Sequence, residues 1–413
     1  TSKDFKYEPY DSFLVKNRKE FQNSNKNLLK ELINVVNSEI DYEKKAGLLF
    51  SGGIDSSTIA VAVNYKNRNK LHLYSGNYDD IEKHIKEKID EQEYKNEIYK
   101  KGFKNINELN ISKSSTISNL DEFLDIYRQP FFFPNLGLIK EIYEKSKLEG
   151  ITKIFNGMDG DSVISYGYEV VRHYFFKFNF FKFYYEIRKL AYYSKIKKRS
   201  VIKLLLLNPI SEYFNSLLKY YKLKRNKPSS SIVNYKFYNH HYKNLKPLNF
   251  KKIYDPYQYH NYVLEDPLRY DSIEKQYFLS KKIGITPIYP FYNIDIIKLC
   301  VNSDATLKLK KGISRSLIRS SFKNRLPEKN LKRLSKSNLG YGFCYQLSVI
   351  DKNFVNSSIS EPSPMIKEYI NIEKLKEIWT DFQKNPYSPE SMQNSMSIFI
   401  FCVLNEWLKK EFI

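Results

Sequence analysis

Residues 47–58 read GLLFSGGIDSST, an apolar run that breaks into a glycine-containing turn, and residues 59–63 continue as the apolar run IAVAV. The apolar residues up to Phe50 predict a buried parallel strand, and the residues after Ser56 predict a helix. The turn between them is therefore expected at the carboxyl end of a strand, which is where α/β sheets bind their ligands.

The turn has the composition of an anion-binding loop. Gly52 and Gly53 let the backbone approach an anion closely, and the N–H groups and positive end of the following helix then face that anion. Ser51, Ser56 and Ser57 add hydroxyl donors to the same site. The alternative is that the Ser-Gly-Gly sequence forms only a tight turn.

Asp55 is the exception among these residues, because a carboxylate repels phosphate groups unless a cation lies between them. It is therefore predicted to be a ligand of Mg²⁺. The Walker pattern G-x-x-x-x-G-K-[ST] does not occur in this segment. Ordinary P-loop phosphoryl transfer is thus not expected.

Residues 51–56 resemble the pyrophosphate loop of the ATP-pyrophosphatase (PP-loop) superfamily, whose members cleave ATP between the α and β phosphates. This superfamily includes asparagine synthetase, β-lactam synthetase, lasso-peptide cyclases, GMP synthetase, argininosuccinate synthetase and tRNA-lysidine synthetase. The resemblance implies an α/β fold, with a parallel sheet of the PP-loop type flanked by helices, and ATP and Mg²⁺ as cofactors. The loop does not select the substrate.

A second strand and loop are predicted about a hundred residues later. Residues 151–155 are apolar enough for a strand, and residues 156–162 form a loop that contains Gly and Asp. Two such loops at neighbouring strand ends are expected to face one Mg-nucleotide from two sides.

Residues 156–168 resemble the second signature of the asparagine synthetase group, G-[DE]-G-[GS]-D-E-L-F-G-G-Y. Gly157, Gly160 and Asp161 match it, and Asp161 takes the place of the aspartate that helps to hold Mg-pyrophosphate. Met158 stands where the family has an acid. Asp159 replaces a glycine and Ser162 replaces a glutamate, so the match keeps the metal site but argues against the amine-activating chemistry of true asparagine synthetase.

The carboxyl part resembles the same family in three segments. Residues 290–293 are similar to P-F-L-D, and residues 312–319 to G-x-x-[KR]-x-x-L-R, with Arg315 as in lasso-cyclase-like relatives. Residues 326–343 resemble L-P…R-x-x-K-x-G-F with a longer spacer. By that match Lys336 takes the place of the active-site lysine that neutralises charge as pyrophosphate leaves. From the residues alone, Lys336 would be a solvated surface lysine.

In this superfamily the adjacent strand edge holds the adenine through backbone groups, which implies Leu49 and Tyr74 as adenine contacts. The alternative is that both are core residues. Residues 71–76 predict the strand of Tyr74, residues 90–101 a helix, and most charges between Asp79 and Lys101 are expected on solvated helix faces.

Composition limits the remaining possibilities. With 413 residues the chain can bury a large core. Its cysteines, Cys300, Cys344 and Cys402, match no metal or disulfide spacing, which predicts a cytoplasmic location. No membrane span or export signal is predicted. The chain starts at Thr1 rather than Met, which leaves open whether residues precede it, and no catalytic amino-terminal cysteine is seen.

The formal net charge of +22 suggests an acidic partner, such as nucleic acid or an anionic membrane, or else reflects an AT-rich genome. The excess is local, because residues 172–227 contain 15 Lys and Arg but 2 acids, giving 15 − 2 = +13. Aromatic residues alternate with these cations. This segment could stack bases, seat a helix in a membrane interface, recognise a peptide leader, or pack its aromatic side on the catalytic lobe.

Four segments are predicted: a helical lead-in (1–46), a nucleotide-binding core (47–168), a basic aromatic helical insertion (169–250) and a largely helical carboxyl part of the synthetase domain (251–413). The family resemblance covers residues 28–407, and the insertion is its least matched part.

The resemblance implies adenylation of a substrate carboxylate, helped by Lys336 and by Mg²⁺ on Asp55 and Asp161, after which an amine displaces AMP to give an amide. The sequence contains no glutaminase half, so free ammonia, a separate glutaminase or an amine of the substrate must serve. A water-excluding lid is expected around Phe131 or in the insertion.

An asparagine synthetase domain is the simplest assignment. A macrolactam cyclase or natural-product ligase, with a leader-binding partner, is the alternative that the loss of the family acid favours. A nucleic-acid-modifying enzyme and a non-catalytic binding module also remain open.

Overall fold

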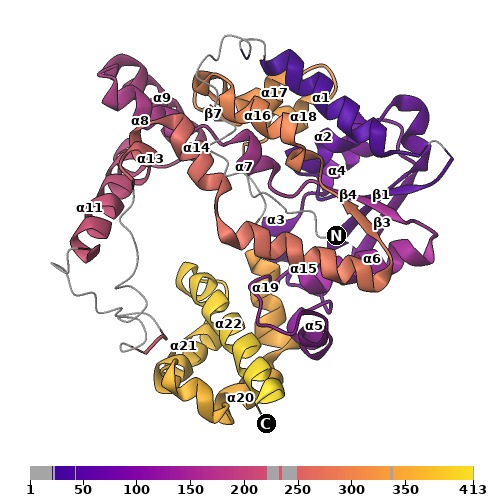
Figure 1. The fold of residues 1–413 in the computed structure, drawn as a ribbon, viewed down its shortest axis with the longest axis vertical. Coiled ribbons are helices and arrows are strands. Elements are labelled where there is room, and N and C mark those ends of the chain that lie inside the picture. Colours follow the sequence, from indigo (N-terminus) through magenta and orange to yellow (C-terminus); the bar gives the residue numbers. More distant parts are fainter. Residues whose placement is uncertain are drawn as a thin grey trace, which may run out of the picture.

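The computed structural model describes residues 21, 24–41, 43–220, 232–234, 249–334 and 338–412. Its central element is a five-stranded sheet in the order β3-β2-β1-β4-β5, in which all neighbouring strands are parallel (Figure 1). The predicted α/β fold class is confirmed. The strands are β1 (Ala46–Leu49), β2 (Leu71–Asn77), β3 (Asn105–Asn110), β4 (Lys153–Asn156) and β5 (Thr286–Ile288).

The strand order places a switch point beside β1. The chain runs from β1 to β2 and β3 on one side, and then returns to add β4 on the other side of β1. Leu49 pairs with Asn156 in the register of β1 and β4, so the loops that follow these two strands start next to each other. Crevices at such points are the usual ligand sites of open α/β sheets.

Helices cover both faces of the sheet. On one face, α1 buries Leu28, Leu32 and Val36, the stripe that its sequence predicts, against a core shared with Leu48 of β1. On the other face, a second core contains Tyr74 and Ile154. The helices of the first face include α1 (Ser24–Glu39), α2 (Ile54–Ala62), α4 (Gln92–Tyr99), α16 (Ile294–Asn302) and α17 (Ser316–Ser321), and those of the second α5 (Leu120–Tyr127), α6 (Leu136–Leu148) and α15 (Pro267–Ile283).

The carboxyl part is helical, as predicted, and continues the second core. Its last helix buries Phe399, Phe401 and Cys402 completely. Figure 1 shows most of these helices in the lower part of the molecule, below α15. They are α19 (Gly340–Tyr345), α20 (Lys352–Ser360), α21 (Ile372–Lys384) and α22 (Pro389–Glu411). The remaining helices of the body are α3 (Lys83–Ile89), α7 (Gly160–Ile164), α14 (Pro256–Leu264) and α18 (Glu328–Lys332).

Residues 169–220 form a helical arm that projects from the body (Figure 1). The arm has a small core of its own, in which Val171, Ile187 and Leu190 are buried. It consists of α8 (Glu169–Phe176), α9 (Phe180–Ser194), α10 (Lys198–Ile202), a π-helical turn (Lys203–Leu207) and α11 (Asn208–Tyr220), with α13 (Lys251–Tyr254) packed against α8. None of the helices in the described part of the chain has the length and apolar character needed to cross a membrane.

The arm touches the body at a β-hairpin formed by β6 (Leu309–Lys310) and β7 (Ile313–Ser314). Glu186 of α9 is buried and accepts hydrogen bonds from the backbone N–H groups of Lys311 (3.1 Å) and Gly312 (2.6 Å). Burial raises the pKa of the Glu186 carboxyl, and the two N–H donors oppose that rise. A Cβ on Gly312 would lie 2.5 Å from the Cβ of Lys189, so arm and hairpin are in tight contact.

Several local predictions are confirmed and others are wrong. The sequence pattern predicts an amphipathic helix over residues 136–148, which is α6. It also predicts a helix that runs to Ile283 and is ended by Gly284, which is α15, and Gly284 has φ +84°. The proline-bounded residues 287–291 are expected to form a loop, but residues 287–288 belong to β5. The strand β3 was not predicted, because its sequence NINELN contains no apolar run.

Phe131 itself does not form part of a lid, and the most exposed rings of the arm do not pack on the catalytic lobe. Phe131 is 5% exposed and packs edge-on against Phe123 and Phe399 at centroid distances of 6.0 and 6.1 Å, so it belongs to the core and not to a lid. In the arm, aliphatic residues make the buried contacts, whereas Phe178 and Phe181 are exposed.

Phe131→Ala is expected to lower the free energy of unfolding by about 3–5 kcal/mol, because the lost ring leaves a cavity between α5 and α22. Guanidinium-induced unfolding measures this change. The control is Phe181→Ala, whose ring is 84% exposed and whose loss should change the free energy by less than about 0.5 kcal/mol. Equal effects of the two substitutions would contradict the core position of Phe131.

Candidate functional site

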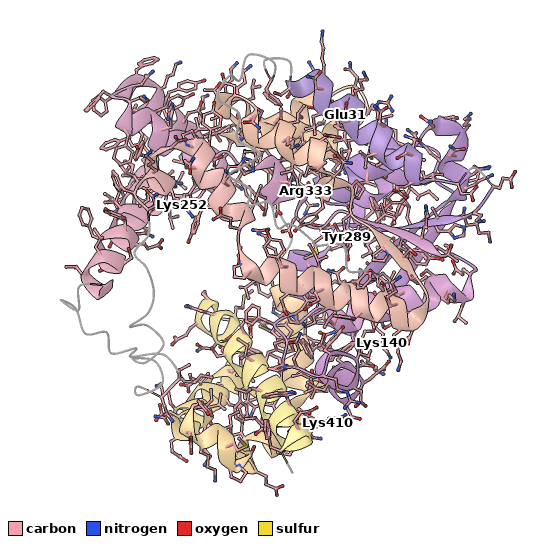
Figure 2. All side chains as sticks on the ribbon, in the orientation of Figure 1. Glu31, Lys140, Lys252, Tyr289, Arg333 and Lys410 are labelled. Carbon is pink, nitrogen blue, oxygen red and sulfur yellow. The ribbon has the colours of Figure 1, made fainter. Side chains whose placement is uncertain are left out.

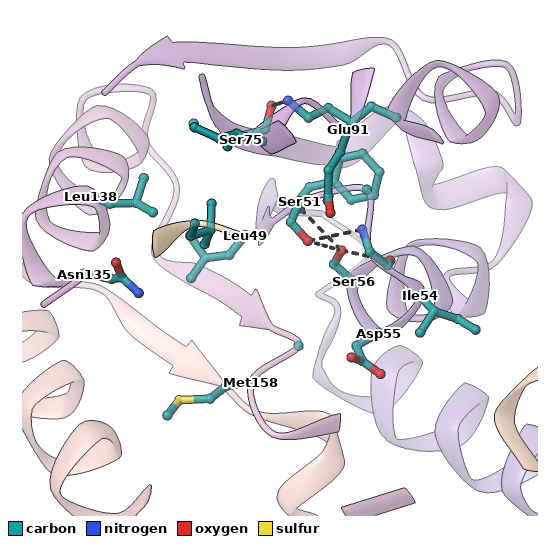
Figure 3. Close-up of a pocket in the computed structure, with 18 of the residues that line it drawn as sticks. Leu49, Ser51, Ile54, Asp55, Ser56, Ser75, Glu91, Asn135, Leu138 and Met158 are labelled. Atoms are coloured by element: carbon teal, nitrogen blue, oxygen red, sulfur yellow. Dashed lines mark hydrogen bonds between the residues drawn. The ribbon is translucent and has the colours of Figure 1, made fainter. Parts of the chain in front are cut away.

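A cavity of about 710 Å³ opens at the carboxyl ends of β1, β2 and β4. Figure 3 shows Ser51, Asp55 and Ser56 of the first loop on one side of it, and Leu49, Leu138 and Met158 on the other. The predicted site residues that line it are Leu49, Ser51, Gly52, Gly53, Asp55, Ser56, Tyr74, Gly157 and Asp161. Segments far apart in the sequence thus form one site.

The serines of the first loop hold the turn in shape. The Ser51 N–H donates to Ser56 Oγ (3.3 Å), and the Gly53 N–H donates to Ser51 Oγ (3.2 Å). Gly53 is the N-cap of α2, so Asp55 lies in the first turn of that helix and near its positive end. Ser57 is fully buried behind the loop and does not line the cavity.

Gly52 has the left-handed backbone conformation that glycine tolerates best, with φ +78°. Helix α4 lies directly against it: a Cβ at position 52 would be 2.9 Å from Cγ of Lys95 and 3.4 Å from the carbonyl oxygen of Glu91. The two requirements, a positive φ and the absence of a side chain, explain why glycine occupies this place in the loop.

Asp55 forms an ion pair with Arg315, which follows β7. The Arg315 side chain is only 7% exposed. Burial alone would lower its pKa, but Asp55 and Asp161 both favour the charged guanidinium and raise the pKa above its ordinary value. A buried pair of this kind ties the first loop to the hairpin, since removal of either partner leaves an uncompensated charge.

The second loop brings Asp161 to the same place. The Tyr166 hydroxyl donates to the Asp161 carboxylate (2.9 Å). Gly160 lies behind the wall of the cavity, where a Cβ would be 2.6 Å from Oδ1 of Asp55, and a Cβ on Gly157 would be 3.1 Å from the Ser56 nitrogen. Both glycines therefore allow the second loop to contact the first.

This arrangement fits a magnesium ion that is bound together with a phosphate ligand. Mg²⁺ is usually held by one or two carboxylates, waters and substrate phosphates, and not by an all-protein cage. Asp55 and Asp161 supply two hard oxygen ligands in adjacent loops. In the described part of the chain no group of three or more His, Cys, Asp or Glu is placed to hold a metal.

Two further arginines gather around the cavity. Arg319 donates to the carbonyl oxygens of Ser314 (3.0 Å) and Arg333 (2.7 Å), and burial together with the nearby Arg315 lowers its pKa to about 10. Arg333, near the centre of the molecule in Figure 2, pairs with Glu91 (2.5 Å) and lies 4.2 Å above the ring of Tyr94. The wall of the cavity therefore carries several cations beside the two aspartates, among other carboxylates.

Lys336 lies outside the described residues. Leu334 and Leu339, on either side of the undescribed segment, both line the cavity. The predicted role of Lys336 remains a prediction.

The sequence analysis missed Lys95 of α4. Its side chain lines the cavity although the residue is only 3% exposed, and its ammonium donates to Asn77 Oδ1 (2.7 Å) and Ser75 Oγ (3.2 Å) at the end of β2. Burial lowers its pKa, and the acids around it, foremost Glu108, oppose that shift. A buried cation thus faces the same space as the first loop.

The expectation that charges between residues 79 and 101 are mostly solvated is wrong for Glu91 and Lys95, which are both buried. A signal was present in the sequence: Glu91, Lys95 and the fully buried Ile98 follow the i, i+4, i+7 spacing of one helix face. A charged residue on the otherwise apolar face of a helix indicates that a neighbouring element supplies a polar partner for it.

The positions that depart from the second signature have local partners. Met158, in the place of the family acid, accepts a hydrogen bond on its sulfur from Gln276 (3.0 Å), and Gln276 also accepts one from Asn156 (2.8 Å). Asp159, in left-handed backbone conformation, pairs with Arg269 and accepts from the Tyr292 hydroxyl. A thioether and an amide thus stand where the signature has a carboxylate.

Leu49 and Tyr74 occupy the apolar side of the cavity with Leu138 and Ile142. The Tyr74 ring is fully buried and its hydroxyl donates to Glu149 (2.5 Å), while its carbonyl accepts the Phe50 N–H (2.7 Å). These contacts make Tyr74 part of the core as well as part of the wall. Together these residues give the cavity an apolar wall.

Gly52→Ala is expected to lower the free energy of unfolding by about 1 kcal/mol for the positive φ and by a further amount for the collision with Lys95. Gly150→Ala is the matched control, because Gly150 has φ +76° but no atom within 4 Å of a built Cβ. Denaturant unfolding compares the two. If both variants lose the same stability, α4 does not constrain the loop.

Comparison with known proteins agrees with this geometry. No curated protein matches the chain at a significant level. The family model described as asparagine synthase matches residues 27–409, which includes both loops, the hairpin and Arg333. This chain belongs to the asparagine synthase family.

Proposed function

We propose that this protein forms an amide bond by activating a carboxylate with ATP, releasing AMP and pyrophosphate. Family membership supports ATP-dependent amide synthesis in general. The observation that carries the specific proposal is that Asp55 and Asp161 meet in adjacent loops of one cavity, beside Arg315, Arg319 and Arg333. Such a site suits a triphosphate with its metal and a pyrophosphate leaving group.

In this proposal the apolar wall of Leu49, Leu138 and Ile142 receives the adenine, and the first loop receives the β and γ phosphates. The substrate carboxylate attacks the α-phosphorus, and the bond from that phosphorus to the bridging oxygen of pyrophosphate breaks. Mg²⁺ held by Asp55 and Asp161 would neutralise phosphate charge. The arginines and Lys336 stabilise the departing anion, so positioning and electrostatics carry the reaction and no side-chain nucleophile is required.

The second step is attack of an amine on the acyl adenylate, which expels AMP and leaves an amide. Ammonia, a glutaminase partner or the substrate itself supplies this amine. Met158 and Gln276 line the cavity where the signature has a carboxylate. This supports, as a second candidate, a macrolactam cyclase or natural-product ligase whose substrate brings its own amine.

We also propose that the reaction takes place in the cytoplasm. The three cysteines are free and fully or largely buried. Unpaired thiols are typical of proteins from reducing compartments.

Asp55→Asn is expected to abolish formation of AMP and pyrophosphate from Mg-ATP, because the loop loses a metal ligand and Arg315 loses its partner. Nucleotide product analysis, with aspartate plus ammonia or with pools of peptides, measures it and identifies the substrate class. Asp381→Asn, at an exposed position of α21, is the control and should leave turnover unchanged. ADP and phosphate as products, or stimulation by RNA alone, would contradict carboxylate adenylation.

Lys95→Met is expected to weaken ATP binding roughly tenfold, which corresponds to about 1.4 kcal/mol, and to leave adenosine binding unchanged. The parent protein should also lose ATP affinity as the pH rises through the lowered pKa of Lys95, because the ammonium is then deprotonated. The variant should not show this pH dependence. Calorimetric titration measures both ligands, and Lys376→Met on α21 is the control. Equal losses for ATP and adenosine would assign Lys95 a purely structural role.

A further inference from the structure

The helical arm exposes aromatic side chains that globular surfaces normally cover. Phe178, Phe181 and Tyr192 are 79%, 84% and 76% exposed. They lie on α9 and on the turn that precedes it. Large exposed apolar patches mark interaction surfaces.

The exposed residues of α9 form one stripe. Phe181, Tyr184, Arg188 and Tyr192 are spaced by three, four and four residues, which places them on one side of a helix. The opposite side, with Ile187, faces the arm's own core. The stripe therefore points away from the arm's core, and its two most exposed rings, Phe181 and Tyr192, stay 84% and 76% exposed although Tyr193 contacts Tyr192 edge-on.

At the start of α9 the phenylalanines form a compact knob. Phe180 packs edge-on against Phe175 (5.9 Å between centroids) and against Phe178 (6.1 Å), and Phe178 adopts φ +55° at the turn. Phe180 is partly covered by these two contacts, whereas Phe178 and Phe181 remain largely exposed. Lys177 and Lys182 flank the knob and are exposed.

Cations surround the aromatic surface and acids are scarce. Between residues 172 and 220 the acids are Glu186, which is buried in the contact with the hairpin, and Glu212. The Lys198 ammonium lies 5.1 Å from the ring centroid of Tyr184 and donates to its hydroxyl (2.9 Å). The exposed cations are Lys177, Lys182, Arg188, Lys195, Lys197, Lys198, Arg199 and Lys203.

We propose that the arm docks on the surface of an anionic lipid membrane. The knob of Phe178, Phe180 and Phe181 enters the interface, Tyr184 and Tyr192 lie at the level of the headgroups, and the lysines contact lipid phosphates. Aromatic rings and cations on one exposed helix face are the composition of interfacial helices. Anionic lipid attracts such a surface through the net charge of the arm.

The same charge would also attract nucleic acid, but the ring geometry favours lipid. Base stacking requires open ring faces at intervals along a groove. Here the two open phenylalanine rings, Phe178 and Phe181, lie together at the start of α9 and not at intervals along a groove, while Phe180 is contacted edge-on by two rings and Lys198 lies over Tyr184. Phenylalanine side chains have no polar group, so a protruding knob of them suits the hydrocarbon boundary of a membrane better than the polar surface of a nucleic-acid strand.

Flotation of the whole protein with lipid vesicles tests the proposal. Binding is expected to vesicles in which about a third of the lipid is phosphatidylglycerol, to fall steeply with salt, and to be at least tenfold weaker with phosphatidylcholine alone. Two variants should each reduce binding at least tenfold: Phe178→Ser with Phe181→Ser, and Lys195→Glu with Lys197→Glu and Lys198→Glu.

Matched controls come from exposed positions outside the arm. The control for the phenylalanine variant is Tyr65→Ser with Leu148→Ser, which removes two side chains that are 76% and 85% exposed. The control for the lysine variant is Lys104→Glu with Lys113→Glu and Lys352→Glu, which changes the net charge by the same amount. Both controls should bind vesicles like the parent. Equal effects of arm and control variants, equal binding to neutral vesicles, or displacement of the vesicles by a single-stranded oligonucleotide would overturn the proposal.

Discussion

The ion pair between Asp55 and Arg315 is the constraint on which the site depends. Its partners are separated by 260 residues, one in the first turn after β1 and the other after the hairpin. Because both side chains are largely buried, each charge requires the other. The pair therefore fixes the first loop, the hairpin and the second loop, whose Gly160 contacts Asp55, as one unit at the switch point of the sheet.

The arrangement of charges follows from that unit. Because the wall of the cavity carries both cations and carboxylates, an anion and a divalent cation that bind together can each lie next to groups of opposite charge. The glycines at positions 52, 157 and 160 allow the backbones to approach closely enough for this. The sulfur of Met158 accepts a hydrogen bond from Gln276, and Asp159 pairs with Arg269 and accepts a hydrogen bond from Tyr292. Both residues that depart from the family signature therefore have hydrogen-bonding partners.

The sequence was sufficient for the elements with strong local signals. The apolar run before Ser51, the periodic stripe of α1 and the glycine after α15 each identify an element by short-range chemistry. It was insufficient where the decisive partner is distant. β3 is an edge strand that needs only backbone bonds to β2, Lys95 is buried because Ser75 and Asn77 accept its hydrogen bonds, and Phe131 is covered by the last helix of the chain. Aromatic content alone also did not show that the arm would pack through its aliphatic residues.

The contact of Glu186 with the hairpin connects the arm to the cavity. The turn of the hairpin donates a backbone hydrogen bond to Glu186 of the arm. Two residues after β7 begins, the same segment carries Arg315, whose guanidinium pairs with Asp55 of the first loop. The arm and the first loop thus contact the same hairpin. A ligand whose binding to the arm shifted this hairpin would change the affinity of the cavity for its own ligand, and by thermodynamic reciprocity occupancy of the cavity would change binding at the arm by the same free energy.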